Sequence, residues 1–167
     1  MVVSIGFAVP QFAQSLTITG ENVHGTAVNL PAASKGKPII IAVASSKKAE
    51  PMLQEWYEPA YLRFVSKQGL FAGSVDVDLW MVPVFTGVNK AAFGPTIERL
   101  KKGVDPEVAE RVVFVKEDAA GLLDRLGIKD RELPYIFAID AEGRIVHQVK
   151  GAFSVEKLDA LEEAVSQ

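Results

Sequence analysis

The chain has 167 residues, of which 49% are hydrophobic and 23% are charged, and it contains no cysteine. The absence of thiols excludes disulfides, thiolate nucleophiles, zinc–thiolate sites and iron–sulfur ligation. Lys and Arg number 18 against 21 Asp and Glu, which gives a net charge of −3. No basic block is long enough to follow a phosphate backbone, so we expect no nucleic-acid partner.

The start of the chain allows two interpretations. Residues 1–20 contain no Asp, Glu, Lys or Arg. Residues 1–15 are either the remnant of a secretory signal, with Ala13 and Ser15 as the small residues before a cleavage point, or an ordered N-terminal strand. No apolar run approaches the roughly 20 residues that span a bilayer, so no membrane insertion is expected. No repeat or linker divides residues 3–167, which are expected to form a single domain.

The first elements expected along the chain are a hairpin and a buried strand. Residues 16–19 and 26–30 read as strands on either side of a turn-rich loop. A Lys-Pro pair then leads into residues 39–44, Ile-Ile-Ile-Ala-Val-Ala. This unbroken and largely β-branched run is typical of a strand buried on both faces, and it predicts a central strand of an α/β sheet.

A long amphipathic helix is predicted next. Its large apolar residues share one helical stripe that should face the sheet; they are Met52, Leu53, Trp56, Tyr57, Ala60, Tyr61, Phe64 and Val65. Pro51 suits the first turn of the helix, where a missing N–H costs nothing, whereas Pro59 inside the pattern should kink it. Gly69 is expected to end the helix.

The second half of the chain predicts alternating strands and helices. In chain order these are a strand at 75–82, a helix at 91–102, a strand at 112–115, a helix at 118–126, a hairpin of residues 135–140 and 144–149, and a last helix capped by Ser154. The helix pattern of this last segment places Leu158, Leu161 and Val165 on its inner face.

Three groups of residues carry a resemblance to a known family. They are Ile5-Gly6 with Ala8, Pro10 and Phe12; Gly36-Lys37-Pro38; and Leu133 to Asp140 followed by Glu142 to Val146 and Gly151. In this order they resemble the thioredoxin-like superfamily, specifically the branch of TlpA-type thioredoxins and AhpC/TSA peroxiredoxins. The resemblance covers essentially the whole chain. It implies an α/β, thioredoxin-like three-layer fold with a central mixed sheet, an N-terminal β-hairpin extension and flanking helices.

A narrower resemblance concerns relatives that lack cysteine. Residues 53–64, 125–128 and 140–152 are similar to the bacterial periplasmic YtfJ proteins and to the mitochondrial ATP synthase assembly-factor family. The resemblance to the thioredoxin-like family favours an extracytoplasmic location, in the periplasm or secreted, and leaves a cytoplasmic location open.

The sequence departs from the family at its catalytic corner. In TlpA-type proteins a Cys-x-x-Cys stands at the start of the long helix, and here Ser46 and Ala49 occupy those two positions. A serine hydroxyl does not ionise near neutral pH and forms no disulfide, so thiol–disulfide exchange and peroxide reduction are expected to be lost. No catalytic residue, cofactor or metal is expected.

The expected function is therefore binding or assembly. The resemblance implies that Pro134 is cis and that the backbone of Leu133 offers a free edge near the two serines, where a protein or an extended peptide can dock. A cis proline also shapes a turn without any ligand. The predicted binding site is this former active corner, made of Ser45, Ser46, Lys47, Lys48, Ala49, Leu133, Pro134 and Tyr135.

Two other functions stay open. Ser46 could serve a non-redox enzyme together with Lys47 or Lys48, although both histidines lie in predicted hairpins and no Gly-x-Ser-x-Gly elbow is present. The apolar run from Trp80 to Phe85 could form the interface of a structural module if its aromatic side chains are exposed.

Charged residues near the corner give two further expectations. The two lysines at 47 and 48, beside a helix N-terminus, could hold an anion. Asp76 and Asp78 share one face of a strand, and one of these carboxylates is expected beneath the former active corner. Two carboxylates supply too few ligands for a metal ion.

Overall fold

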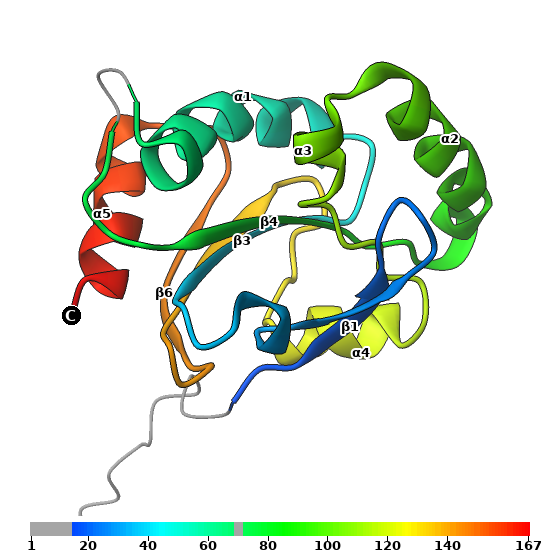
Figure 1. Cartoon of the computed structure of the whole chain (residues 1–167). Helices are drawn as coiled ribbons and strands as arrows, with labels where there is room; N and C mark the ends of the chain where they lie inside the picture. Colours follow the sequence, from blue (N-terminus) through cyan, green and yellow to red (C-terminus); the bar gives the residue numbers. More distant parts are fainter. Residues whose placement is uncertain (1–14, 69–71) are drawn as a thin grey trace, which may run out of the picture.

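A four-stranded mixed sheet lies at the centre of the structure, a computed structural model that describes residues 15–68 and 72–167 (Figure 1). Its strands are β3 (Ile39–Ala44), β4 (Asp78–Pro83), β5 (Tyr135–Ile139) and β6 (Ile145–Lys150), in the order β4-β3-β5-β6. β3 runs parallel to β4 and antiparallel to β5, and β5 is antiparallel to β6. All six residues of β3 are buried, as the sequence predicts for a central strand.

Helices and a hairpin cover the two faces of this sheet. The α-helices are α1 (Ala49–Tyr61), α2 (Phe93–Gly103), α3 (Pro106–Ala109), α4 (Ala119–Arg125) and α5 (Val155–Val165). In the described part of the chain, short turns are formed by the 3-10 helices η1 (Ala32–Ser34) and η4 (Gly87–Ala92) and by the π-helical turn η2 (Leu62–Ser66). The antiparallel hairpin consists of β1 (Ile18–Glu21) and β2 (Ala27–Leu30).

Side chains that point alternately to the two faces of β3 belong to two separate hydrophobic cores. Ile41 and Val43 pack with the hairpin and α4, whereas Ile40 and Ala42 pack with α1, α2, α3 and α5. Successive side chains of a strand point to opposite faces, so one strand serves both cores. Figure 1 shows the resulting layers, with α1 and α3 above the sheet and α4 below it. The three-layer α/β fold with a hairpin extension is confirmed.

Residues 112–115 join the hairpin to the sheet. The sequence predicts a buried strand here, and the structure forms isolated parallel bridges to Met81 and Val84 and an antiparallel bridge to Glu21. The amide of Phe114 donates to the carbonyl of Glu21 at 2.8 Å, and the amide of Val113 donates to the carbonyl of Met81 at 2.8 Å. The predicted position is confirmed, although the pairing is broken into single bridges.

Two prolines lie in the long helix, Pro51 in its first turn and Pro59 near its end. α1 contains Pro59 and passes directly into the π-helical turn η2. Proline lacks the N–H that an α-helical ladder needs, so a change of hydrogen-bond register is a natural response. Trp56 is 1% exposed, and its indole Nε1 donates to the carbonyl of Gly151 at 2.8 Å, which fixes α1 to the loop after β6.

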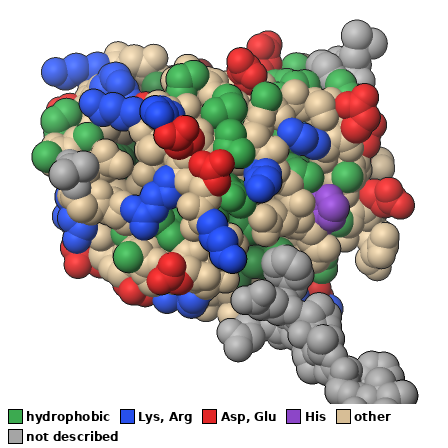
Figure 2. All heavy atoms as spheres, turned by 180° about the vertical axis from the view of Figure 1, so that it is seen from behind, with side chains coloured by type: hydrophobic (Ala, Val, Ile, Leu, Met, Phe, Trp, Pro, Cys, Tyr) green, Lys and Arg blue, Asp and Glu red, His purple; other side chains and the backbone are tan. Residues whose placement is uncertain are grey.

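Some expectations fall on residues that the structure does not describe. Of residues 1–15 only Ser15 is described, in an antiparallel bridge with Arg144, so neither interpretation of this segment is tested. Gly69, the expected end of the long helix, also lies outside the described residues. Within 15–68 and 72–167, no helix has both the length and the apolar character needed to cross a membrane. Figure 2 shows basic and acidic side chains spread over the same face of the molecule.

Candidate functional site

Ser46 and Ala49, the positions that the sequence resemblance equates with a cysteine pair, lie where β3 ends and α1 begins. Ala49 is fully buried, and Ser46 is half-buried. The hydroxyl of Ser46 donates to the carbonyl of Arg131 at 2.6 Å and accepts from the amide of Ala49 at 3.3 Å. Ser46 therefore ties the first residue of α1 to the loop before β5.

Lys48 gives Ser46 no catalytic base. Its ammonium forms an ion pair and a hydrogen bond with Glu132. The hydrogen bond and the charge of Glu132 raise the pKa of Lys48 above its usual value, so the amine stays protonated and cannot accept a proton. Because the hydroxyl of Ser46 is itself hydrogen-bonded to the backbone, the geometry does not support a serine nucleophile.

The Leu133–Pro134 peptide bond is trans, so the expectation of a cis Pro134 is wrong. Among the described residues the only cis bond joins Leu30 and Pro31. Trans is the isomer that X–Pro bonds favour intrinsically, and the contacts of Ser46 and Lys48 hold the preceding loop. Pro134 is buried, and Tyr135 is buried in β5 opposite Val43.

A groove begins on the other side of the corner, and we name it the corner groove. Its volume is about 520 Å³, and it runs between α1 on one side and η4, α2 and α3 on the other, over the ends of β3 and β4. Apolar side chains make up most of its wall, among them Leu53, Met81, Val84, Phe85, Leu100 and Val108. This volume falls within the range of small-molecule sites in proteins.

Polar groups lie at two points of the corner groove. Ser45 is 3% exposed, and its hydroxyl has no hydrogen-bond partner among the described residues. The buried hydroxyl of Tyr57 is also unpartnered in this part of the chain. Burial raises the pKa of Tyr57 to about 12, so this phenol remains a donor at neutral pH. Lys47, Glu50 and Arg99 supply the charges of the lining.

The structure divides the predicted site into two parts. Ser45, Ser46 and Lys47 line the corner groove. Lys48 is paired with Glu132, and residues 133–135 lie on the side of the corner away from the groove lining. The sequence predicted α2 but missed α3, which completes the opposite wall, because α3 has only four residues and shows no helical period.

The aspartates do not lie beneath the former active corner. Asp78 pairs with Ile39 at the start of β3, whereas Ser45 follows its far end. Five steps of a strand separate these ends by about 16 Å. Asp76 instead forms ion pairs with Lys37 at 3.1 Å and Lys67 at 3.7 Å, and the hydrogen bond from Lys37 lowers its pKa. No group of three metal-ligating side chains gathers anywhere in the described residues.

The apolar run from Trp80 to Phe85 belongs to the core. Phe85 is 6% exposed, and its ring lies 5.3 Å from that of Phe93 and 6.3 Å from that of Phe114. Trp80 is partly buried, and its Nε1 donates to the hydroxyl of Ser34 at 2.9 Å. The exposed aromatic surface that a structural interface would need is therefore not present at these residues.

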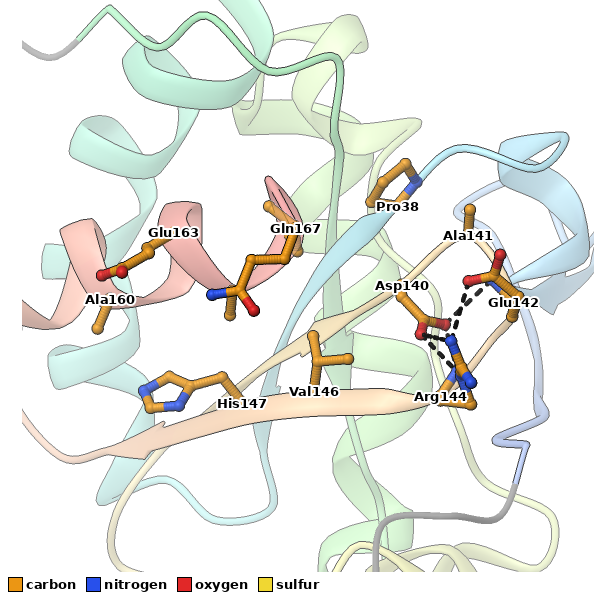
Figure 3. A pocket seen from close by; sticks show the side chains of 12 residues that line it. Pro38, Asp140, Ala141, Glu142, Arg144, Val146, His147, Ala160, Glu163 and Gln167 are labelled. Atoms are coloured by element: carbon orange, nitrogen blue, oxygen red, sulfur yellow. Dashed lines mark hydrogen bonds and ion pairs between the residues drawn. The ribbon is translucent and has the colours of Figure 1, made fainter.

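A second hollow, of about 660 Å³, lies between α5 and the β5–β6 hairpin (Figure 3). Its guanidinium, that of Arg144, is already bound to Asp140 at 2.8 Å and to Glu142 at 3.3 Å. Burial opposes ionisation of Asp140, but hydrogen bonds from Arg144 outweigh it and lower the pKa of that carboxyl. Because these charges are paired with one another, this hollow offers less to a ligand than the corner groove.

Comparisons with known proteins were made on sequence and on structure. No protein-family model matches the chain, and no curated protein matches it. Solved structures do match. The thioredoxin domain of a thiol-disulfide oxidoreductase from Bacteroides vulgatus has a TM-score of 0.63 and 19% identity, over 95% of this chain and 99% of that domain.

Two further structures show the same likeness. The exposed lipoprotein thioredoxin of Streptococcus pneumoniae has a TM-score of 0.61 and 17% identity, over 89% of this chain and 99% of that protein. StoA from Bacillus subtilis has a TM-score of 0.55 and 19% identity, over 89% of this chain and 98% of that protein. The chain therefore has the thioredoxin-like fold of these proteins, without any cysteine.

Proposed function

We propose that this chain is a redox-inactive thioredoxin-like protein that binds an apolar segment of a partner protein, in a binding or assembly role. The observation that carries the proposal is the corner groove, which opens at Ser45, Ser46 and Lys47, beside the position of the lost cysteine pair. A chain without thiols cannot exchange disulfides or reduce peroxides, so recognition is the part of the family's activity that this corner can retain.

The apolar lining supports a binding role. Leu53, Phe85 and Leu100 lie in the wall of the groove. A bound segment that supplies apolar side chains would cover this lining.

The binding site of the proposal differs from the one predicted from sequence. It keeps Ser45, Ser46 and Lys47, and it adds the wall formed by α2 and α3 in place of the edge at residues 133–135. One of the similar structures is an exposed lipoprotein, which supports an extracytoplasmic location for this chain as part of the proposal.

Panning a peptide display library against the purified chain tests the proposal. Thr96 lies in the α2 wall of the groove, so Thr96→Trp should fill it and weaken the selected peptides at least tenfold. Ala120→Trp adds the same side chain at an exposed position of α4 and should leave affinity unchanged. Peptides that bind both variants equally well, or a library that yields no binder, would contradict the proposal.

A further inference from the structure

We infer that the outer edge of β6 is a docking surface for residues 9–14 of this chain, which pair with it as an additional antiparallel strand of the central sheet. The inference goes beyond the proposed function, because β6 contributes no residue to the corner groove. Three features of the described residues carry it: a strand pairing that begins at Ser15, the open edge that follows this pairing, and two hollows along the edge.

The pairing that leads into the segment begins at Ser15. This residue forms an antiparallel bridge with Arg144, and the amide of Leu16 donates to the carbonyl of Gly143 at 2.9 Å. In an antiparallel ladder, residues earlier in one strand lie opposite residues later in the other. A ladder that continues from Ser15 therefore brings the preceding residues to β6, and the six residues 9–14 match the six positions of that strand.

The outer edge of β6 is open in the part of the chain that the structure describes. β6 is the last strand in the order β4-β3-β5-β6, and beyond the bridge of Ser15 its one strand partner among those residues is β5. The amide of Gly151 donates to the carbonyl of Pro134 on the β5 side. Because amides alternate along a strand, those of Gln148 and Lys150 point to the outer edge. Unpaired backbone groups at an edge are a template for a further strand.

Hollows flank this edge on both faces of the sheet. The hollow of about 660 Å³ beside α5 has Val146 and His147 in its lining (Figure 3). On the side of α4 lies another hollow, of about 680 Å³, whose lining includes Ser15, Ile145 and Gln148. Successive side chains of a strand point to opposite faces, so an added strand would place alternate side chains over the two hollows.

The composition of the segment suits this position. Residues 9–14 are Val-Pro-Gln-Phe-Ala-Gln and carry no charge, so no ionic group leaves water when they pair. Proline is tolerated on an edge strand, so Pro10 is compatible with the pairing. Val146 is 42% exposed, which is high for a valine in a strand, and a strand laid along β6 would cover part of it.

The position of Ser15 favours this chain as the occupant over a second copy. A β6 strand of another molecule would have to displace the bridge between Ser15 and Arg144. The residues before Ser15 are joined to it covalently, which gives them a high effective concentration at the edge. Their pairing would close the edge against association with other chains.

Amide hydrogen exchange of the full chain, followed by NMR, tests the inference. The amide of Leu16 faces β6, so alternation turns the amide of Gln14 toward β6 and that of Ala13 away from it. We expect Gln14→Pro to accelerate exchange at Gln148 and Lys150 at least about tenfold. Ala13→Pro is the matched control and should preserve the slow exchange, because an edge strand tolerates proline where the N–H faces solvent.

Three results of this experiment would overturn the inference. Exchange at Gln148 and Lys150 of the wild type at the rate of an unstructured peptide would mean that the edge is open. Equal exchange in the two proline variants would contradict the antiparallel pairing. Protection that rises with protein concentration would mean that a second copy occupies the edge.

A spin label gives a second readout if Gln14→Pro does not fold. The chain has no cysteine, so a nitroxide attached to Ala8→Cys is the only label in the molecule. It should broaden the amide signal of Lys150 within the same molecule, and broadening seen only between molecules, or none, would overturn the inference. The corner groove is tested separately by Thr96→Trp, so either proposal can fail while the other stands.

Discussion

The hydroxyl of Ser46 makes two hydrogen bonds inside the fold. It donates to the carbonyl of Arg131 and accepts from the amide of Ala49. We expect Ser46→Ala to lower the free energy of unfolding by about 1 kcal/mol, the usual net contribution of an intramolecular hydrogen bond. Ser74→Ala, at an exposed position, is the control and should cost less than half of that. Urea denaturation measures both, and equal stability of the two variants would contradict a structural role for Ser46.

Tyr57 should show the opposite behaviour, because its buried hydroxyl has no partner among the described residues. We expect Tyr57→Phe to leave the free energy of unfolding unchanged or to raise it by up to about 1 kcal/mol. The control is Tyr135→Phe, which removes the acceptor of the Asp130 amide and should lower the free energy of unfolding. A clear destabilisation by Tyr57→Phe would mean that this hydroxyl has a partner inside the fold.

The same side chain gives a dependence on pH. Burial raises the pKa of Tyr57 from 10.0 to about 12 in the folded chain. Between these values the unfolded chain loses this proton while the folded chain keeps it, so its contribution to stability is complete below pH 10 and declines toward pH 12. Stability measured from pH 9 to pH 11 should fall more steeply in the wild type than in Tyr57→Phe. Parallel curves would contradict the raised pKa.

Among the elements, the contact between β1 and residues 112–115 depends on a glycine. A Cβ at Gly20 would lie 2.5 Å from the carbonyl oxygen of Phe114 and 2.7 Å from Cγ1 of Val113. We expect Gly20→Ala to cost about 1–3 kcal/mol, as overpacking does. Gly94→Ala, in α2 with open space around the new Cβ, should stabilise the chain by about 0.5–1 kcal/mol. Equal effects on the melting temperature would show that the close approach is absent.

The elements that the sequence predicted are those with a strong local pattern. The β-branched run of β3, the hairpin of β5 and β6, and α5 with its Ser154 cap all follow from periodicity and capping. The capping prediction is confirmed by the hydroxyl of Ser154, which accepts from the amide of Lys157 at 3.3 Å. Such patterns involve residues close in sequence, and here the tertiary structure agrees with the local preference.

The parts that could not be predicted depend on contacts between distant residues. The corner groove exists because α1 stands opposite α2 and α3, and no pattern within one helix specifies that spacing. Tyr57 belongs to the apolar stripe of α1, so the sequence placed it in the core, yet it lines the groove. The isomer of Pro134 was inferred from a resemblance, and the loop contacts of Ser46 and Lys48 could not be read from the sequence.

At the scale of the whole molecule, we expect the fold to accept a cysteine pair at the start of α1. Ser46 is half-buried and Ala49 fully buried at the start of α1, and a helix N-terminus lowers the pKa of a thiol there. We expect the double variant Ser46→Cys, Ala49→Cys to form an intrachain disulfide on mild oxidation, whereas the wild type should not reduce insulin. The single variant Ser46→Cys is the control. Two free thiols after oxidation would show that the corner has lost the geometry of the pair.

The central claim is that a partner segment binds in the corner groove, and the most direct measurement is a methyl NMR titration of the wild-type chain with a panned peptide. We predict shifts at Leu53, Leu100 and Val104, which line the groove, and their loss in Thr96→Trp. Shifts confined to Val146, in the hollow beside α5, or to Leu133 would contradict the account.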